Sequence, residues 1–219
     1  MKKNGSSLER MLQFVTMMHS FQQIRRKVRA TGEHRWENDA EHSYQLAMVC
    51  WYIIDSEQLD LDFSKAMLYA MVHDIPEIYA GDPCIFTDGP EALVGKEKRE
   101  RKAMARLAKE FREFTGLHEA LVAYNKRQDR ESRFVYAMDK ILPFYNIVLD
   151  DGKTWKQFNT SLDEVLAAKE NKIRICPVAS QKLDEILVEM RQHQGELFSK
   201  STTPFPEDEV VAPASEWGQ

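Results

Sequence analysis

The stretch Leu68–Pro83 places one imidazole and three carboxylates in a predicted helix and its exit turn. The residues before the imidazole are almost all apolar, which predicts a helix that is buried on most sides. The helical period gathers three of the polar side chains on one broad face, and a Gly-containing turn brings the fourth beside them. These polar residues are His73, Asp74, Glu77 and Asp82.

Charged groups that enter a core need partners, so this stretch allows two interpretations. One is a salt-bridged structural network, and the other is a set of ligands around a cation. Within this stretch alone, the network is slightly favoured. Pro76 lies inside the predicted helix and removes one backbone hydrogen bond, so we expect a kink or a loosened last turn beside the carboxylates.

Apolar residues recur at spacings of three and four along most of the chain, which predicts an all-α fold. No alternating run is long enough to propose a sheet. Residues 30–40 are expected to form a loop, and the Gly- and Pro-rich residues 84–95 a lid or pocket wall. The predicted helices cover residues 7–28, 39–56, 62–80, 96–114, 117–124, 131–147 and 155–194, the last interrupted near residues 173–178.

The bulk composition is that of a globular protein with one sizeable core. With 219 residues, of which 43% are hydrophobic and 30% charged, we expect a single domain over residues 1–198 and a loose tail over 199–219. The net charge of −5 argues against a nucleic acid partner. No apolar run approaches the roughly 20 residues of a membrane span, and none resembles a signal peptide, so we expect a cytoplasmic protein without a membrane partner.

Two further regions add polar residues to apolar helices. His42 lies in the first turn of the predicted helix 39–56, and Asp139 lies among apolar neighbours in the helix 131–147. With His73 and Asp74 they make two imidazoles and two carboxylates, a mixed nitrogen and oxygen set that suits a divalent metal. None of the three cysteines forms a Cys-x-x-Cys pair, so neither a disulfide framework nor a zinc knuckle is indicated.

The order of these residues resembles the HD superfamily of metal-dependent phosphohydrolases, whose pattern is a His, a later His-Asp pair and a distant Asp. Longer segments resemble the branch that contains bacterial 5′-deoxynucleotidase, over roughly residues 8–150. These segments are Ala-Glu-His-Ser at 40–43, His-Asp-x-x-Glu-x-x-x-Gly-Asp at 73–82, Lys96 with Glu97 and Glu100, and Glu-Ser-Arg-Phe-Val-Tyr-Ala-Met-Asp-Lys at 131–140.

The resemblance implies an HD-domain helical bundle that hydrolyses (deoxy)nucleoside 5′-monophosphates, and a homodimer. It implies one divalent metal ion, which could be Mn, Co, Ni, Fe, Zn or Mg, held by His42, His73, Asp74 and Asp139. Glu77 is then the first candidate for proton transfer and Asp82 the second. Candidates for substrate binding are Arg35, Trp36 and Lys96, together with some of the basic residues 25–29.

Two other functions stay open. The same ligand set would serve a hydrolase of deoxynucleoside triphosphates or of an alarmone nucleotide. A non-enzymatic helical binding protein would instead use the His and Asp residues as a structural network. Likewise, Arg35 and Trp36 could bind a phosphate and a planar base, but a Trp that closes a core edge is about as common.

Overall fold

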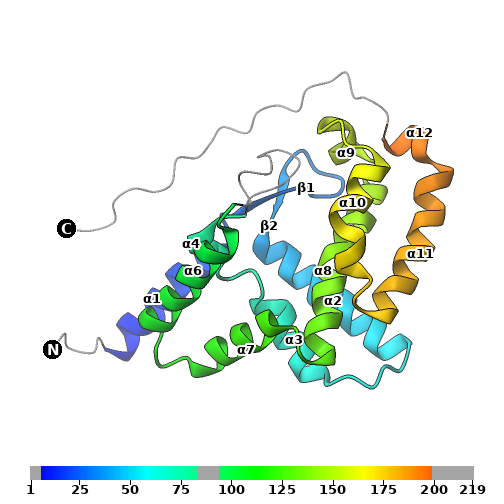
Figure 1. Cartoon of the computed structure of the whole chain (residues 1–219). Coiled ribbons are helices and arrows are strands. Elements are labelled where there is room, and N and C mark those ends of the chain that lie inside the picture. Colours follow the sequence, from blue (N-terminus) through cyan, green and yellow to red (C-terminus); the bar gives the residue numbers. More distant parts are fainter. Residues whose placement is uncertain (1–5, 83–93, 199–219) are drawn as a thin grey trace.

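The computed structural model describes residues 6–82 and 94–198, and it shows a helical bundle arranged around one long central helix, α8 (Figure 1). The short helix α9 (Lys153–Gln157) and five longer helices pack against α8. The all-α bundle predicted from the apolar spacing is therefore confirmed. The central helix is α8 (Arg130–Leu149), and its neighbours are α2 (Asp39–Ser56), α3 (Phe63–Val72), α7 (Thr115–Lys126), α10 (Leu162–Ile173) and α11 (Pro177–Gln192).

Local capping signals set the start of three helices. In each, the N-cap side chain accepts a hydrogen bond from the backbone three residues later, and the glutamate there accepts one from the N-cap backbone. The N-cap residues are Ser6 for α1 (Ser7–Phe21), Asn38 for α2 and Ser161 for α10. The start of α2 matters for function, because it places His42 in the first turn of a core helix.

Two apolar clusters form the interior. The larger one lies between α2, α3, α8, α10 and α11, and the smaller one joins α1 to α7 and to α6 (Lys96–Glu110). Leu183 and Met190 of α11 are fully buried in the larger cluster, which bears out core packing for this helix. The remaining short helices are α4 (Glu77–Ala80), α9 (Lys153–Gln157) and α12 (Gln194–Leu197).

The predicted helix over residues 7–28 is wrong in its last third. α1 ends at Phe21, and the basic residues that follow form strand β1 (Arg25–Arg29). β1 pairs antiparallel with β2 (Trp36–Asn38), within the segment that we expected to be only a loop. The strands are too short for an alternating pattern to be visible, and Ile24 and Val28 are four apart, which also suits a helix.

The predicted helix over residues 62–80 is divided into two. α3 ends at Val72, α4 begins at Glu77, and residues 73–76 form a turn between them. Within this turn the backbone hydrogen bonds join residues that are three apart, as in a 3₁₀ turn. For example, the Glu77 N–H donates to the Asp74 carbonyl over 2.8 Å. Because Pro76 cannot donate a backbone hydrogen bond, the break is sharper than the expected kink, and it places His73 and Asp74 at the end of a helix.

Some expectations fall outside the described residues. These are the tail over residues 199–219 and most of the proposed lid, residues 83–93. Among the helices of the described part of the chain, none is both long and apolar enough to cross a lipid bilayer.

Candidate metal centre

Three separate elements bring the four predicted ligands to one place. His42 comes from the first turn of α2, His73 and Asp74 from the turn after α3, and Asp139 from the middle of α8. One possible ligand atom from each residue lies within 4.8 Å of all the others. The centre is buried, because His42 is fully buried and Asp139 is 2% exposed.

The two imidazoles turn a nitrogen toward the carboxylates. The Nδ1 atom of His73 lies 2.9 Å from the Ala70 carbonyl, where it donates a hydrogen bond, and this directs Nε2 into the site. That Nε2 lies 2.9 Å from Asp74 Oδ2 and 3.8 Å from Asp139 Oδ1. The Nε2 atom of His42 lies 3.1 Å from Asp139 Oδ1.

The donor set fits a divalent metal ion. The buried His73 Nε2 has no partner with hydrogen-bond geometry within the described residues, although two carboxylates surround it. A buried nitrogen left in this state is an available ligand, and its backbone bond through Nδ1 is the usual outer support of a metal-binding His. Neutral imidazole with carboxylate oxygen suits borderline first-row ions.

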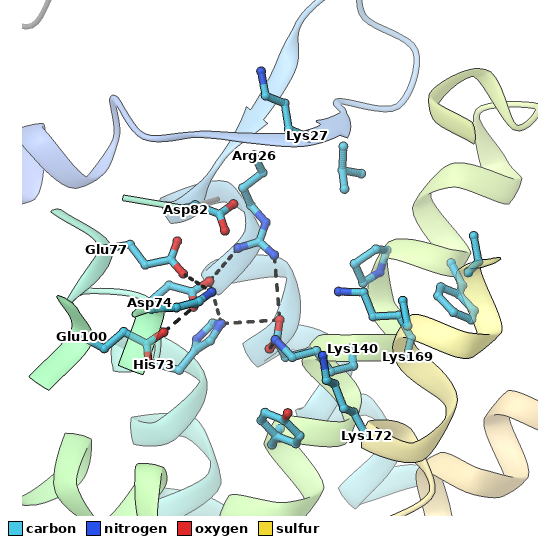
Figure 2. A pocket seen from close by; sticks show the side chains of 18 of the residues that line it. Arg26, Lys27, His73, Asp74, Glu77, Asp82, Glu100, Lys140, Lys169 and Lys172 are labelled. Carbon is cyan, nitrogen blue, oxygen red and sulfur yellow. Dashed lines mark hydrogen bonds and ion pairs between the residues drawn. The ribbon is translucent and has the colours of Figure 1, made fainter. Parts of the chain in front are cut away.

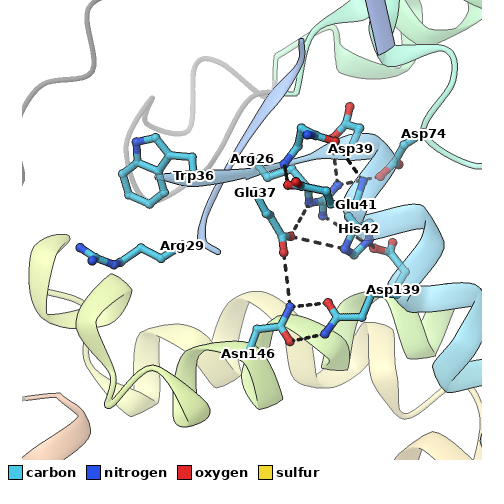
Figure 3. Close-up of polar contacts among 12 residues, drawn as sticks. Arg26, Arg29, Trp36, Glu37, Asp39, Glu41, His42, Asp74, Asp139 and Asn146 are labelled. Atoms are coloured by element: carbon cyan, nitrogen blue, oxygen red, sulfur yellow. Dashed lines mark hydrogen bonds and ion pairs between the residues drawn. The ribbon is translucent and has the colours of Figure 1, made fainter. Parts of the chain in front are cut away.

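Arg26 of β1 reaches into the same carboxylates, as Figures 2 and 3 show. Its Nη1 lies 2.6 Å from Asp74 Oδ2 and 3.4 Å from Asp39 Oδ1, and its Nη2 lies 3.9 Å from Asp139 Oδ1. Its Nε lies 3.2 Å from Glu37 Oε1. The guanidinium is therefore the main fixed cation of the centre.

The crowded charges shift the pKa values of the ligands. Burial alone would lower the pKa of His73, but Asp74 and Asp139 outweigh it and raise the pKa to about 10. Burial works against ionisation of Asp74 too, yet His73 and Arg26 hold its pKa well below the usual range. The pKa of Asp139 is lowered as well, by Lys140, His42 and His73 against the effect of burial. Asp74 and Asp139 are thus ionised, and these buried carboxylates need cations beside them.

A second group of carboxylates lies next to these ligands. Oxygens of Asp39, Glu77 and Asp82 come within 4.8 Å of one another. Burial and then Asp74 raise the pKa of Asp39 to about 8, and burial followed by Asp74, Asp82 and Asp39 raises the pKa of Glu77. Glu77 can therefore hold a proton near neutral pH, which is the property of a proton-transfer residue.

The centre opens into a cavity of about 480 Å³. His73, Asp74 and Asp139 line one side, together with Glu77 and Asp82. This volume is within the range of small-molecule sites. Further walls are formed by basic residues, including Lys96, Lys140, Lys169 and Lys172, and by apolar residues, including Phe144, Trp155, Phe158 and Val165.

The predicted substrate residues occupy different surroundings. Lys96 lines the cavity, and its Nζ lies 3.8 Å from Glu77 Oε1. Arg35 pairs instead with Glu33 and Glu41, at 2.6 Å and 2.8 Å. Trp36 is buried and stacks on Phe158 with ring centres 5.6 Å apart. Neither Arg35 nor Trp36 is among the residues that line the cavity.

Sequence reasoning missed several charged residues of the site. Arg26 was predicted only as one of the basic residues 25–29 at the end of a helix. The structure places it instead in strand β1, which directs its side chain toward Asp74. Asp39 also carried no signal, because it directly follows the N-cap Asn38 at the start of α2, a position where an acidic residue is usually solvated; the structure buries it completely. The lysines of α10 carried no signal, because a Lys beside an apolar helix stripe is usually solvated.

One family model matches most of the chain. The profile of the HD domain family matches residues 20–178 of the chain. A solved structure from Magnetospirillum magnetotacticum MS-1, described as a predicted metal-dependent phosphohydrolase, is 26% identical. The similarity covers 86% of this chain and 95% of that one, with a TM-score of 0.72.

Two archaeal structures are also similar. A protein from Pyrococcus horikoshii OT3 is 25% identical with a TM-score of 0.55, over 83% of this chain and 99% of that one. A conserved hypothetical protein from Pyrococcus furiosus has the same fold at 23% identity and a TM-score of 0.56, with the same coverage of both chains. No protein with a curated description matches the chain.

Proposed function

The chain belongs to the HD domain family, and from this premise we propose that it is a metal-dependent phosphohydrolase of (deoxy)nucleoside 5′-monophosphates. The observation that carries the proposal is the buried group of His42, His73, Asp74 and Asp139, whose ligand atoms lie within 4.8 Å at the wall of a nucleotide-sized cavity. The similar Magnetospirillum protein, described as a predicted metal-dependent phosphohydrolase, supports the reaction class.

The four ligands would hold one divalent ion. When bound, such an ion polarises a phosphate oxygen and lowers the pKa of a coordinated water. Arg26 would bind another phosphate oxygen, because its guanidinium already lies among the carboxylates that the phosphate approaches. Lys96 would assist as a second cation, because it lines the same cavity and its Nζ lies 3.8 Å from Glu77 Oε1.

Glu77 would move the proton that the reaction requires. It lies on α4, directly after the turn that carries His73 and Asp74, and it is 7% exposed. Its raised pKa allows it to hold a proton and deliver it to the leaving 5′-oxygen. Asp82, which faces the same cavity, would share this role or bind a sugar hydroxyl.

A screen of phosphate release from nucleoside mono- and triphosphates, with Mn, Co, Ni, Mg and Ca in turn, tests the proposal. We expect inorganic phosphate from a 5′-monophosphate and the least activity with Ca, because imidazole ligands disfavour it. Release of triphosphate would identify the triphosphohydrolase instead. His118→Ala is the matched control, since this half-buried His bonds the Phe111 carbonyl and does not line the cavity.

Metal content separates the enzyme from a structural network. Protein purified without chelator should contain about one ion per chain and gain thermal stability from Mn or Co. If it contains none and gains no stability, then Arg26 and Lys140 balance the carboxylates, and the His and Asp residues form only a structural network.

A further inference from the structure

Three lysines line the cavity on the side opposite Glu77 and Asp82 (Figure 2). Lys140 comes from α8, and Lys169 and Lys172 come from α10. The last two are three residues apart, so they lie on the same face of their helix. This face of α10 borders the cavity. Helices α8 and α10 thus both supply cations to one wall of the cavity.

Only one of these lysines has a carboxylate partner. Lys140 Nζ lies 2.5 Å from Asp139 Oδ2, whereas within the described residues no carboxylate lies at ion-pair distance from Lys169 or Lys172. Burial and then the neighbouring charge of Lys140 lower the pKa of Lys169 to about 8, and the same two causes lower that of Lys172. Both lysines therefore add positive charge to this wall, and an anion in the cavity would offset it.

These two lysines are unsuited to the phosphate that is cleaved. That phosphate would bind at the metal centre, where Arg26 is the adjacent cation. Within the described residues neither Lys169 nor Lys172 forms a hydrogen bond or ion pair with any of the four ligands, and both come from α10, beyond Lys140 (Figure 2). An anion bound there would be a separate group of the same ligand.

We propose that Lys169 and Lys172, assisted by Lys140, bind a second phosphate of the substrate, distinct from the phosphate that is hydrolysed. The inference rests on the proposed function and narrows its substrates to 5′-phosphate monoesters that carry a further phosphate. Because the cleaved group must remain a monoester, the second phosphate belongs to another sugar hydroxyl, as in a nucleoside 3′,5′-bisphosphate. Phe144, Trp155 and Phe158 supply the apolar wall that a base requires.

For a bisphosphate the chemistry is that of the monophosphate. Water forms the new P–O bond, the ester P–O bond at the metal ligands breaks, and the leaving sugar oxygen takes the proton. The second phosphate takes no part and remains on the nucleoside product. Its contribution is binding energy, which charge-assisted hydrogen bonds from two ammonium groups can supply.

The test compares kcat/KM for a deoxynucleoside 5′-monophosphate, the corresponding 3′,5′-bisphosphate and the 5′-di- and triphosphates. The wild-type protein should prefer a substrate with a second phosphate by about tenfold or more, the size expected for charge-assisted hydrogen bonds. A preference for the 5′-di- or triphosphate over the 3′,5′-bisphosphate would overturn the inference. In Lys169→Gln/Lys172→Gln the preference should fall to about twofold or less, while Lys169→Arg/Lys172→Arg should retain most of it.

Lys102→Gln is the control, since this exposed Lys of α6 does not line the cavity and should leave the preference unchanged. The double variant should fold, because among the described residues neither lysine forms an ion pair that the change would break. Equal kcat/KM for all substrates in the wild type would overturn the inference, and so would an equal loss for all substrates in the double variant.

Calorimetric binding separates this inference from the proposed function. If no nucleotide releases phosphate with any ion, the proposed function fails, but the lysine site is still measured by titration with the bisphosphate and the monophosphate. Tighter binding of the bisphosphate that disappears in the double variant supports the site. Equal binding of both ligands by the wild type refutes it.

Discussion

Glu77 and the four predicted ligands should respond differently to substitution. Glu77→Gln keeps the side-chain shape and removes only the ionisable oxygen, so metal content should survive while turnover falls by roughly 100-fold or more. His73→Ala or Asp139→Ala should lower metal content, turnover and thermal stability together. Metal analysis beside steady-state rates checks both. A Glu77→Gln protein that loses its ion would identify Glu77 as a ligand, and near-normal turnover would remove its catalytic role.

The raised pKa of His73 predicts that metal binding depends on pH. In the ion-free protein this pKa is about 10, above its ordinary value of 6.5, so His73 is protonated at neutral pH. A metal must displace that proton, and affinity should therefore rise as pH rises toward the pKa, with about one proton released per ion. The same shift stabilises the ion-free fold fully below pH 6.5, and this stabilisation is lost as pH rises through about 10.

Calorimetry in buffers of different ionisation enthalpy measures the released proton. His118→Ala should behave as the wild type, because this His bonds a backbone carbonyl away from the cavity. Metal affinity that stays constant from pH 6.5 to 9 would show that His73 carries no proton before the ion binds.

At the scale of elements, the connection between α8 and α9 depends on Gly152. Its φ is +70°, and an added Cβ would collide with the backbone of Leu197 at the end of α12. Gly32 has a similar φ of +79° but open space around it. Gly32→Ala should therefore destabilise the fold by about 1 kcal/mol, for the left-handed backbone alone. Gly152→Ala should cost about 3 kcal/mol or more, because backbone must also move.

Urea unfolding followed by circular dichroism compares the two glycine variants. The difference between them isolates the contact of α9 with α12, since the backbone conformation is common to both positions. Equal destabilisation would mean that α12 does not hold its place against this connection.

For the whole molecule, the predicted homodimer needs an exposed apolar surface, which the buried face of α11 does not supply. Leu183, Ile186, Leu187 and Met190 are buried in the core, so α11 cannot offer them to a partner. An exposed apolar stripe lies instead on α2, where Tyr44, Met48, Trp51 and Tyr52 follow helical spacing and are 43–72% exposed. Contiguous apolar surface of this kind is typical of an interface.

We expect sedimentation velocity to show a dimer at micromolar concentration and Trp51→Glu to give a monomer. Val188→Glu is the control, because Val188 is a comparably exposed apolar residue on α11. A monomeric wild type would contradict the predicted dimer. A dimer that persists in Trp51→Glu would show that the interface does not include this face of α2.

The sequence alone was sufficient for the helical bundle and for the residue types of the centre. Capping residues and apolar periodicity are local, so the starts of α1 and α2 were predictable. Imidazoles and carboxylates inside apolar helices are costly without partners, and this cost identified His42, His73, Asp74 and Asp139 as one group. The structure brings these four side chains together.

Only the tertiary structure decided which further charges surround that group. Arg26 enters it because β1 pairs with β2, and strand pairing depends on residues distant in sequence. Lys169 and Lys172 line the cavity because α10 packs on α8, although their spacing also suits a solvated helix face. Local pattern records which face of an element is apolar, whereas the charges that meet across a cavity are determined by how the elements pack.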